Sequence, residues 1–398
     1  MISKLVAIYY KALENVSLDF TRYLYAQINW ENRFIMIKGA RGVGKTTMLL
    51  QHILRTFPDK SQALYVSVDN SWFATHSMVE LAEYATSHGI MNLFFDEVHK
   101  YDHWDQQLKE MYDSFPKLKV VVTGSSMLQL ETCQADLGRR VRQYTLHGMS
   151  FREYLQLEGI ASWRPLELDD LLKNHLPLAA KLTNEQPVLA YFEKYLQEGY
   201  YPFYREQGDG FLQRLETNIN NVINVDIPMV DKTITYESVY KMKTLLRILA
   251  EQNPYTLNIN DLSRTLSCSR DIVYKMFDLM HRAALIRRLY TKEGGMKVLQ
   301  KPEKILFNNT NLMCALSQQV DTGTMRETFF ANMLATNHQI CMPQKGDLFV
   351  DGRYLFEVGG KNKDYSQIAN QENSFVVRDG IDIGCANKIP LWLFGLLY

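Results

Sequence analysis

The sequence lacks an excess of charge of either sign. Lysine and arginine together number 44, and aspartate and glutamate also number 44, in a chain of 398 residues. A chain that binds nucleic acid over most of its surface usually has a strongly positive balance. Any contact with nucleic acid would therefore have to come from a local basic patch.

Cysteine and long apolar runs are also scarce. The five cysteines stand far apart, and no Cys-x-x-Cys pair occurs, which argues against a disulfide framework and a structural zinc site. No stretch approaches the roughly 20 apolar residues of a membrane span, and charge interrupts the N-terminal apolar run too early for a signal peptide. We therefore expect a soluble protein of the reducing cytoplasm, with room for about two to four domains at this length.

A glycine-rich stretch lies between the apolar run 34–37 and the helical pattern 48–54. It fits the phosphate-binding pattern G-x-x-x-x-G-K-[ST]. Its glycines allow backbone N–H groups to approach phosphate oxygens, and the following helix points its positive end at the same place. We expect Lys45 to reach the outer phosphates and the Thr46 hydroxyl to hold Mg²⁺, whereas the alternative is an ordinary glycine-rich turn. The predicted phosphate loop consists of Gly39, Ala40, Arg41, Gly42, Val43, Gly44, Lys45, Thr46 and Thr47.

An acidic pair, Asp96 and Glu97, follows a later apolar run, 91–95. An aspartate at the end of a buried strand can hold Mg²⁺ through water, and a glutamate directly after it can polarise the attacking water. Taken alone, the pair could equally be two surface acids at a strand end. Thr123, at the end of the next apolar run, is predicted to bond the γ-phosphate or the water, with a simple Thr-Gly-Ser turn as the alternative.

Apolar runs alternate with helical patterns over the first 150 residues or so. This order predicts an α/β fold with a parallel sheet covered on both faces and a ligand at the carboxyl ends of its strands. Residues 4–30 are predicted to form a helix ahead of the sheet. The predicted strands are 34–37, 63–68, 91–95, 119–122 and 143–146, and the predicted helices are 48–54, 77–87 (opened by a capping box) and 105–113.

Two further groups of side chains follow the acidic pair. His99 and His103, spaced i, i+4, could bind zinc on a helix, but no third ligand is apparent, so exposed or capping histidines are favoured. An arginine from the cluster Arg139, Arg140 and Arg142 can stabilise charge on a phosphoryl group in transfer. The alternative for each is a solvated basic loop.

These motifs together resemble the AAA+-related ATPases of bacteria and archaea. The resemblance rests on Gly-Ala-Arg-Gly-Val-Gly-Lys-Thr-Thr, Phe-Phe-Asp-Glu-Val-His-Lys followed by Trp104, Val-Thr-Gly-Ser-Ser, Leu-Gly-Arg-Arg and His-Gly-Met-Ser-Phe-Arg-Glu-Tyr. In that family an ATPase core precedes a winged helix and a C-terminal domain resembling the PD-(D/E)XK nucleases.

The resemblance implies ATP and Mg²⁺ as cofactors. It implies that Lys45 and Thr46 contact the phosphates and the metal, and that Asp96 binds Mg²⁺. It also implies that Glu97 is the base and favours Arg139 as the arginine that acts in phosphoryl transfer.

The middle of the chain is predicted to be helical and then to change character. Residues 152–230 are rich in aromatics at helical spacing, which predicts a helical lid with a packed aromatic core rather than a base-stacking surface. Helices at 260–266 and after Ser269, followed by a hairpin of 285–290 and 296–299, predict a winged helix-turn-helix.

The winged-helix segment is locally basic. Residues 264–304 contain ten lysines and arginines against four acids, a balance of 10 − 4 = +6. This balance supports contact with DNA phosphates, although winged helices also serve as protein-docking or lid modules. The candidate DNA contacts are Arg270, Lys275, Arg287 and Arg288.

The C-terminal part offers an incomplete nuclease pattern. That pattern needs an aspartate and a Glu-x-Lys on neighbouring strands, so that two carboxylates share Mg²⁺ and the lysine orients the water. The candidates are Glu327 on a helix, Asp347, Glu357 and the nearest lysine, Lys361, because Gly359 stands where the lysine is needed.

The turn at Asp351-Gly352 decides how these residues meet. A two-residue turn would point Asp347 and Glu357 to opposite faces, whereas a three-residue loop would set them opposite each other. We expect a nuclease-like fold retained for structure or nucleic-acid docking rather than an active nuclease. The closing apolar run 389–398 is predicted to be a buried terminal strand.

The predicted organisation has four parts and one main activity. The parts are an ATPase core (1–151), a helical lid (152–230), a winged helix (231–318) and a small α/β nuclease-like domain (319–398). Mg²⁺-dependent ATP hydrolysis would drive rearrangement of the C-terminal region, on DNA or on a protein client, in a monomer or a homo-oligomer. The alternatives are an ATP-regulated DNA nuclease and a nucleotide-gated DNA-binding regulator without turnover.

Overall fold

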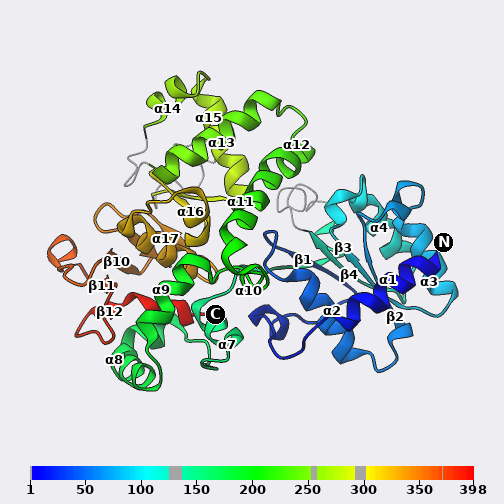
Figure 1. Ribbon diagram of the computed structural model, residues 1–398, viewed down its shortest axis with the longest axis horizontal. Helices are drawn as coiled ribbons and strands as arrows, with labels where there is room; N and C mark the ends of the chain where they lie inside the picture. The colour runs from blue at the N-terminus through cyan, green and yellow to red at the C-terminus, as the bar shows by residue number, and fades with distance from the viewer. Residues whose placement is uncertain (1, 125–136, 252–257, 292–301, 370) are drawn as a thin grey trace. The chain divides into compact units, whose positions relative to one another are not determined.

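The computed structural model describes residues 2–124, 137–251, 258–291, 302–369 and 371–398. The chain divides into two compact units, Met1–Gly148 and Met149–Tyr398 (Figure 1). The end of the first unit lies close to the boundary predicted at residue 151. The three parts predicted after that residue belong to one compact unit, so the boundaries between them stay a prediction.

A five-stranded parallel sheet forms the centre of the first unit. Its strands are β1 Phe34–Lys38, β2 Ala63–Ser67, β3 Asn92–Asp96, β4 Lys119–Gly124 and β5 Arg142–Thr145, in the order β2-β3-β4-β1-β5. All five lie within about two residues of the predicted apolar runs. Because β1, β4 and β3 are parallel neighbours, the stretches that follow β1 and β3 emerge at the same edge of the sheet, with β4 between them.

Helices connect and cover these strands. They are α1 Ile2–Glu14, α2 Lys45–Thr56, α3 Met78–Ser87 and α4 Trp104–Ser114, with the 3₁₀ turns η1 Tyr23–Ala26, η2 Lys60–Gln62, η3 Ser71–Ala74 and η4 Val98–Lys100. The capping box at the start of α3 is confirmed, since Ser77 and Glu80 bond each other's backbone N–H groups. The helix predicted to reach residue 30 was wrong beyond Glu14. The Ser17 hydroxyl bonds Asp19 at 2.8 Å, a local contact that competes with helix formation.

An aromatic core holds the first helices of the second unit together. The helices are α7 Phe151–Leu157, α8 Leu168–Glu185, α9 Val188–Glu198, α10 Tyr204–Gln207, α11 Phe211–Asn221 and α12 Ile227–Val230, with η5 Gly208–Gly210 and the π-helical turn η6 Val222–Asp226. Phe192 packs edge-on against Phe151 at 5.3 Å and against Phe329 at 4.8 Å between ring centroids. The predicted core role of these aromatics is therefore confirmed. Phe329 comes from the C-terminal part, which explains why the two parts form one unit.

Three helices and a two-stranded sheet follow. They are α13 Tyr236–Glu251, α14 Ile259–Thr265, α15 Arg270–Arg282, β6 Ile286–Leu289 and β7 Lys304–Phe307. Ser269 caps α15 as predicted, and the predicted apolar face of α15 is buried. β6 pairs antiparallel with β7, whereas the strand predicted at 296–299 lies outside the described residues.

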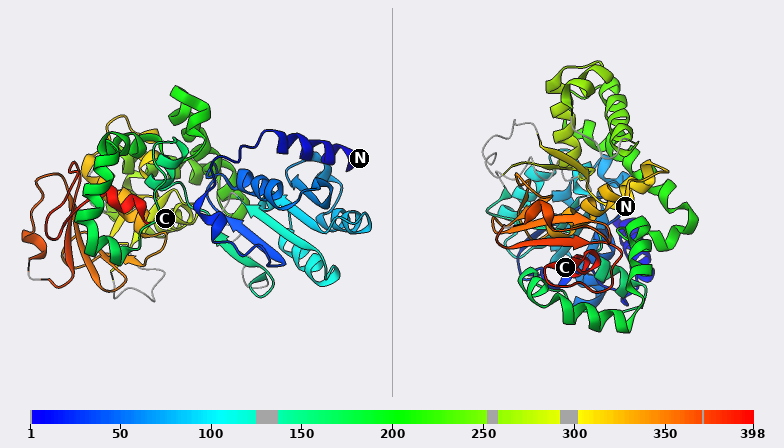
Figure 2. Two further views of the ribbon diagram at one scale, coloured as in Figure 1. Left: turned by 90° about the horizontal axis from the view of Figure 1, so that it is seen from below. Right: turned by 90° about the vertical axis from the view of Figure 1, so that its left-hand side faces the viewer.

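A second five-stranded sheet and four short or medium helices complete the chain (Figure 2). The strands β8 Ile340–Cys341, β9 Leu348–Val350, β10 Tyr354–Gly359, β11 Ser374–Arg378 and β12 Lys388–Pro390 lie in the order β12-β11-β10-β9-β8. β10, β11 and β12 are parallel, and β9 is antiparallel to both its neighbours. The helices are α16 Thr310–Leu316, α17 Thr322–Leu334, η8 Ser366–Ile368 and η9 Leu391–Leu396.

The predicted terminal strand was wrong for most of its length. Only Lys388–Pro390 is a strand, and η9 follows it with every residue buried. Pro390 has no N–H to donate to a strand ladder, so the ladder ends there.

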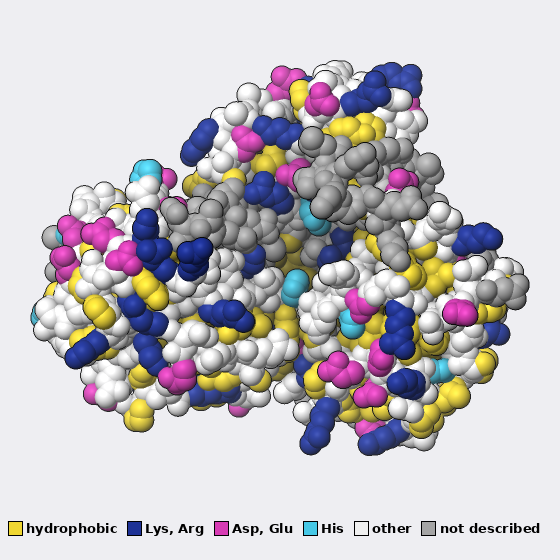
Figure 3. Space-filling view, turned by 180° about the vertical axis from the view of Figure 1, so that it is seen from behind, with side chains coloured by type: hydrophobic (Ala, Val, Ile, Leu, Met, Phe, Trp, Pro, Cys, Tyr) yellow, Lys and Arg dark blue, Asp and Glu magenta, His cyan; other side chains and the backbone are white. Residues whose placement is uncertain are grey.

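Two surface properties bear on partners. None of the helices in the described part of the chain combines the length and apolar character that a membrane span requires. Lys and Arg side chains on the face shown in Figure 3 are interspersed with Asp and Glu, as the even charge balance would suggest.

Candidate functional site

The glycines of the predicted phosphate loop are required by the backbone. Gly42 and Gly44 have φ of 86° and 95°, a left-handed conformation that favours glycine. A side chain at Gly39 would collide with the carbonyl oxygen of Leu146. The loop joins β1 to α2, and Gly44 is the N-cap of α2, so the first turn of that helix points its N–H groups into the loop.

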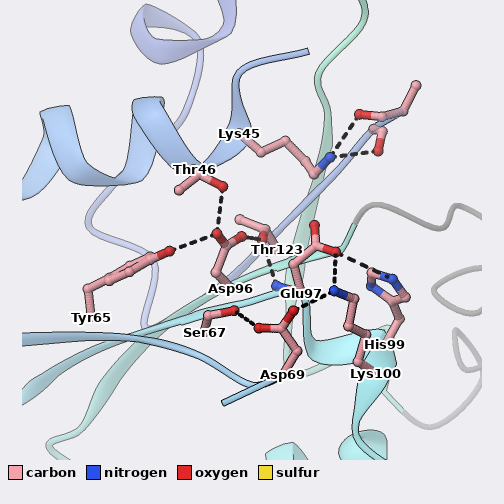
Figure 4. Close-up of polar contacts among 12 residues, drawn as sticks. Lys45, Thr46, Tyr65, Ser67, Asp69, Asp96, Glu97, His99, Lys100 and Thr123 are labelled. Atoms are coloured by element: carbon pink, nitrogen blue, oxygen red, sulfur yellow. Dashed lines mark hydrogen bonds and ion pairs between the residues drawn. The ribbon is translucent and has the colours of Figure 1, made fainter. Parts of the chain in front are cut away.

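Lys45 and Thr46 begin α2 at the base of this loop. Lys45 is buried, and its Nζ donates to the carbonyl oxygens of Gly39 and Ala40, both at 2.9 Å (Figure 4). The Thr46 hydroxyl donates to Asp96 Oδ2 at 2.5 Å. The phosphate loop and the acidic pair, separated by about 50 residues in the sequence, therefore meet at one edge of the sheet.

Asp96 accepts hydrogen bonds from three hydroxyl groups. Besides Thr46, Tyr65 on β2 donates to its Oδ2 at 2.9 Å, and Thr123 on β4 donates to its Oδ1. Burial, together with the Asp96 carboxylate, raises the pKa of Tyr65, so this phenol remains a donor. The sequence offered one weak signal for Tyr65, a tyrosine within a mostly aliphatic strand, but the contact depends on β2 lying next to β3.

Thr123 serves both members of the acidic pair. Its side chain is fully buried, and its hydroxyl accepts the Glu97 N–H at 3.2 Å while it donates to Asp96. The predicted contact of this hydroxyl with a γ-phosphate or water stays a prediction. In the structure this hydroxyl donates its hydrogen bond to Asp96 and accepts one from the Glu97 N–H.

Glu97 sits at the junction of β3 and η4 with a strained backbone, φ 60°. Its Oε2 lies 3.6 Å from Lys100 Nζ and 3.7 Å from His99 Nε2. Burial, and next the nearby cations Lys45 and Lys100, lower the pKa of His99 to about 3. The imidazole is therefore neutral near pH 7, and its contact with Glu97 is dipolar rather than an ion pair.

Of the two histidines that were expected to be exposed or to cap a helix, His99 does neither. His99 is only 3% exposed, so it is neither solvent-exposed nor a cap. His103 is exposed and occupies the N-cap position of α4 with no side-chain capping bond. The two side chains lie in different environments because a turn separates η4 from α4.

A buried arginine that sequence reasoning missed is linked to the loop. Arg22, within the segment predicted to be helical, donates to the carbonyl oxygen of Val43 and to that of His147, the latter at 2.8 Å. It thereby joins the phosphate loop to the segment after β5. No local pattern marks this residue, since both partners are backbone atoms far away in sequence.

The arginine cluster spans the turn before β5 and the first residue of that strand. Arg139 is exposed, as is Arg142 on the strand, and Arg140 forms an ion pair with Asp113 at 3.2 Å. Ser125 and Ser126 of the Thr-Gly-Ser-Ser motif lie outside the described residues.

The residues at the loop suit a hard divalent cation. Over the described ranges of the chain, no group of three or more His, Cys, Asp or Glu side chains is arranged to hold a metal. Mg²⁺ at nucleotide sites typically takes only one or two protein oxygens together with phosphate and water. The Thr46 hydroxyl and the Asp96 carboxylate, in direct contact, are oxygen donors of that kind.

The C-terminal hairpin settles the alternative left open by the sequence. Val350 pairs with Tyr354, which makes the connection a three-residue loop and brings Asp347 opposite Glu357. The Asp347 carboxylate accepts the Val358 N–H at 2.7 Å.

The lysine beside Glu357 is Lys363, not the predicted Lys361. Lys363 Nζ forms an ion pair with Glu357, whereas Lys361 is exposed. A Cβ on Gly359 would lie 2.6 Å from Lys363 Cγ, so the Lys363 stem occupies the space where a side chain at position 359 would begin. Burial raises the pKa of Glu357, and the Asp347 charge adds to this rise although Lys363 opposes it.

Glu327 on α17 belongs to the same neighbourhood. It forms an ion pair with Lys304 of β7. Burial raises its pKa, Lys304 opposes the rise, and the Asp347 charge adds to it. Sequence reasoning found all three acids but neither Lys304 nor Lys363, which form ion pairs with Glu327 and Glu357.

The four candidate DNA contacts are not equally available. Arg270 is exposed at the start of α15, and Lys275 Nζ lies 2.6 Å from Asp231. Arg288 bonds Asp278 at 2.6 Å with a side chain 11% exposed, and burial lowers the pKa of Arg287, which donates to Asn308. The two β6 arginines therefore contact other protein groups, and their predicted contact with DNA stays a prediction.

Comparison with known proteins agrees with this geometry for the first unit. Residues 31–155 match the family model described as AAA domain (AAA_14), and residues 189–323 match a domain of unknown function (DUF8612). The parallel sheet, the phosphate loop and the match to the AAA domain model together support a P-loop NTPase fold of the AAA type for the first unit.

Two relatives come from Methanocaldococcus jannaschii. The uncharacterized protein MJ1637 is 28% identical over 393 residues, 91% of this chain and 82% of its own length. The uncharacterized protein MJ1544 is 28% identical over 149 residues, 36% of this chain and 33% of its own length.

Solved structures with some similarity are more distant. The Walker-type ATPase PABY2304 of Pyrococcus abyssi is 13% identical with a TM-score of 0.40, covering 79% of this chain and 95% of that one. AMPPCP-bound DnaA from Aquifex aeolicus is 13% identical with a TM-score of 0.26, covering 70% and 88%. Scores this low establish no shared arrangement of the whole chain.

Proposed function

We propose that the chain binds ATP with Mg²⁺ at the loop of the first unit and hydrolyses it. The observation that supports this most strongly is the 2.5 Å contact between the Thr46 hydroxyl and Asp96. It joins the phosphate loop and the acidic pair into one site, which a glycine-rich turn and two unrelated surface acids would not do.

Each side chain has a role in this proposal. The loop N–H groups and Lys45 bind the phosphates, and the Thr46 hydroxyl and Asp96 would hold Mg²⁺, which when bound neutralises phosphate charge. Thr123 and Tyr65 fix the Asp96 carboxylate.

Two further residues act on the reaction itself. Glu97, directly after Asp96 at the end of β3, would accept the proton of the attacking water. The exposed Arg139 is assigned to phosphoryl transfer, on its own nucleotide or on that of a second copy.

ATP turnover with matched variants tests the assignment. We expect Lys45→Ala to lose ATP binding and Glu97→Gln to bind ATP but lose turnover. The controls are Lys109→Ala and Glu110→Gln, two exposed α4 residues of the same types. Equal turnover in the wild type, Lys45→Ala and Glu97→Gln would remove the enzyme assignment, and ATP binding without turnover in the wild type would favour the nucleotide-gated regulator.

The position of Arg139 in an assembly can be tested by mixing. If Arg139 acts on a neighbour's nucleotide, inactive Lys45→Ala and inactive Arg139→Ala chains should regain turnover when combined. No recovery, with turnover lost in Arg139→Ala alone, would mean that the arginine acts within its own chain.

We further propose that α14, α15, β6 and β7 form a winged helix that contacts DNA through Arg270. Two consecutive helices followed by an antiparallel strand pair support this assignment, as does the local positive balance. Binding of a DNA duplex should weaken steeply with salt and should be reduced by Arg270→Ala, but not by Arg55→Ala, an exposed arginine on α2. Unchanged binding in Arg270→Ala would contradict the contact.

The C-terminal sheet supports a second candidate function, metal-dependent DNA cleavage in a nuclease-like domain. The supporting observation is the three-residue loop that brings Asp347 opposite Glu357, with Lys363 beside them. Two carboxylates and a lysine are the groups that such cleavage needs.

Cleavage of supercoiled DNA with Mg²⁺ or Mn²⁺, with and without ATP, tests this candidate. Glu357→Gln and Lys363→Met should abolish cleavage, whereas Lys361→Met should not, because its side chain points to solvent. No cleavage by the wild type, or cleavage that survives Glu357→Gln, would leave the domain a structural or docking module.

A further inference from the structure

Helix α13 of the second unit exposes two tyrosines on one of its faces (Figure 1). Tyr236 is 89% exposed and Tyr240 is 66% exposed, the two highest fractions among the large hydrophobic residues in the described part of the chain. Two neighbouring exposed rings differ from the single apolar side chains that scatter over any protein surface. The opposite face of the helix packs into the unit through Val239, Met242, Leu245, Leu246, Leu249 and Ala250.

Two cations continue the line of the tyrosines along α13. At about 100° per residue, positions 236, 240, 243 and 247 of a helix lie within a sector of about 60°. They are occupied by Tyr236, Tyr240, Lys243 and Arg247, which we call the α13 stripe. Arg247 is exposed and Lys243 is partly exposed. At the helical rise the stripe is roughly 17 Å long, with the rings at one end and the cations at the other.

The acids close to the stripe in the sequence are mostly engaged by other lysines. Glu237 forms an ion pair with Lys241 at 2.6 Å, and Asp231 forms one with Lys275 at 2.6 Å. Glu251, the last residue of α13, is an exposed acid beyond the cationic end of the stripe. Two cations against this one acid leave the exposed face of the helix positive.

A single strand of nucleic acid has the chemistry that such a stripe recognises. Unpaired bases offer flat faces that stack on aromatic rings, and the phosphates between them are attracted by lysine and arginine. A duplex fits less well, because its bases are already stacked on one another. An acidic peptide would match the two cations but not the two neighbouring rings.

We propose that the α13 stripe binds a single strand of DNA or RNA, with bases stacked on Tyr236 and Tyr240 and phosphates next to Lys243 and Arg247. The proposal goes beyond the duplex contact assigned to Arg270, and it does not depend on ATP hydrolysis. Because every base has a face that can stack, the binding should show little sequence preference.

Fluorescence anisotropy of the full chain with labelled oligo-dT and oligo-U of about 12 nucleotides tests the proposal at low salt. Tyr236→Ala/Tyr240→Ala should weaken binding at least about tenfold. Tyr236→Phe/Tyr240→Phe keeps both rings and should stay within about threefold of the wild type. The control is Tyr10→Ala, which removes another exposed tyrosine, on α1, and should change nothing. Binding of either probe supports the proposal, and the tighter one identifies DNA or RNA as the partner.

Two measurements separate stacking from charge attraction. Lys243→Gln/Arg247→Gln should lower the slope of log Kd against log salt concentration by about 0.7 for each cation removed. An abasic oligonucleotide of the same length keeps the phosphates but has no bases, so it should bind at least about tenfold more weakly than oligo-dT. Both tyrosines are exposed, so thermal melts should show that the tyrosine variants fold like the wild type.

Three results would overturn the proposal. They are no binding of either oligonucleotide by the wild type, equal binding of the abasic strand, and wild-type affinity in Tyr236→Ala/Tyr240→Ala. If the wild type binds neither oligonucleotide but forms a dimer that the alanine pair abolishes in sedimentation, the stripe is an interface between copies of the chain instead.

A DNA duplex as a further probe keeps the two nucleic-acid proposals apart. If Arg270→Ala loses duplex binding but the alanine pair keeps single-strand binding, only the stripe is overturned. If the alanine pair loses single-strand binding but Arg270→Ala keeps duplex binding, only the Arg270 contact is overturned.

Discussion

Replacing Thr123 by valine should uncouple the acidic pair from β4. Valine keeps the shape of threonine but removes the hydroxyl that donates to Asp96 and accepts the Glu97 N–H. One bond to a carboxylate and one to a backbone N–H contribute together about 2–3 kcal/mol, because the Asp96 Oδ1 oxygen and the Glu97 N–H would each lose this hydrogen bond in a water-poor site. Asp96 keeps its bonds from Thr46 and Tyr65, which limits the loss to that range.

The effect should appear in both stability and turnover. For a unit of this size, the loss corresponds to a fall in Tm of roughly 5–10 °C. If about 2 kcal/mol of it is also lost from the transition state, kcat falls about 30-fold. Thr123→Ser, which keeps the hydroxyl, should lie close to the wild type in both measurements. Wild-type Tm and kcat in Thr123→Val would refute the role assigned to this hydroxyl.

Two further predictions concern the same unit. Burial, together with the Lys119 cation, lowers the pKa of His52 from its ordinary 6.5 to about 4. Between pH 6.5 and 4 the unfolded chain binds a proton at His52 that the folded unit does not bind. The free energy of unfolding therefore keeps its full value above pH 6.5 and falls by at most about 3 kcal/mol as the pH drops to 4. Urea melts at both pH values should show this loss in the wild type but not in His52→Gln, and an equal loss in both would contradict it. Gly39→Ala should weaken ATP binding by at least about tenfold, because the added Cβ would collide with the Leu146 carbonyl group. Gly210→Ala is the control, since open space surrounds that position and ATP binding should not change. Calorimetric titration of both variants with ATP compares their affinities.

Hydrogen bonds over long sequence separations account for most of what the sequence did not reveal. Arg22 reaches backbone carbonyls after β1 and β5, and Tyr65 reaches Asp96 from a neighbouring strand. A backbone carbonyl group is the same in every residue type, so no sequence pattern marks it as a partner. The order of strands in a sheet also cannot be read from the sequence of any single strand. The ion pair between Lys100 and Asp69 also joins residues far apart in the sequence. Only the pairing of β2 with β3 brings together the turns that follow these two strands.

The C-terminal hairpin shows where local rules become ambiguous. Asp351-Gly352 is typical of a two-residue turn, yet the strands pair around a three-residue loop. A shift of one residue exchanges the faces of all side chains on a strand, so the burial of the whole sheet selects the register rather than the turn residues alone. Lys363 likewise takes its place beside Glu357 because Gly359 leaves room for its stem.

The sequence by itself determined the phosphate loop, the five parallel strands of the first unit and the acids that face the loop. Those features depend on residue type, backbone freedom and apolar periodicity, which act over a few residues and are visible in the chain. Only the tertiary structure decided which hydroxyl, lysine and arginine side chains hold those acids and that loop, and which face the C-terminal acids share. Contacts of this kind depend on strand order and register, because the free energy of burying an entire sheet, rather than any short segment, selects them.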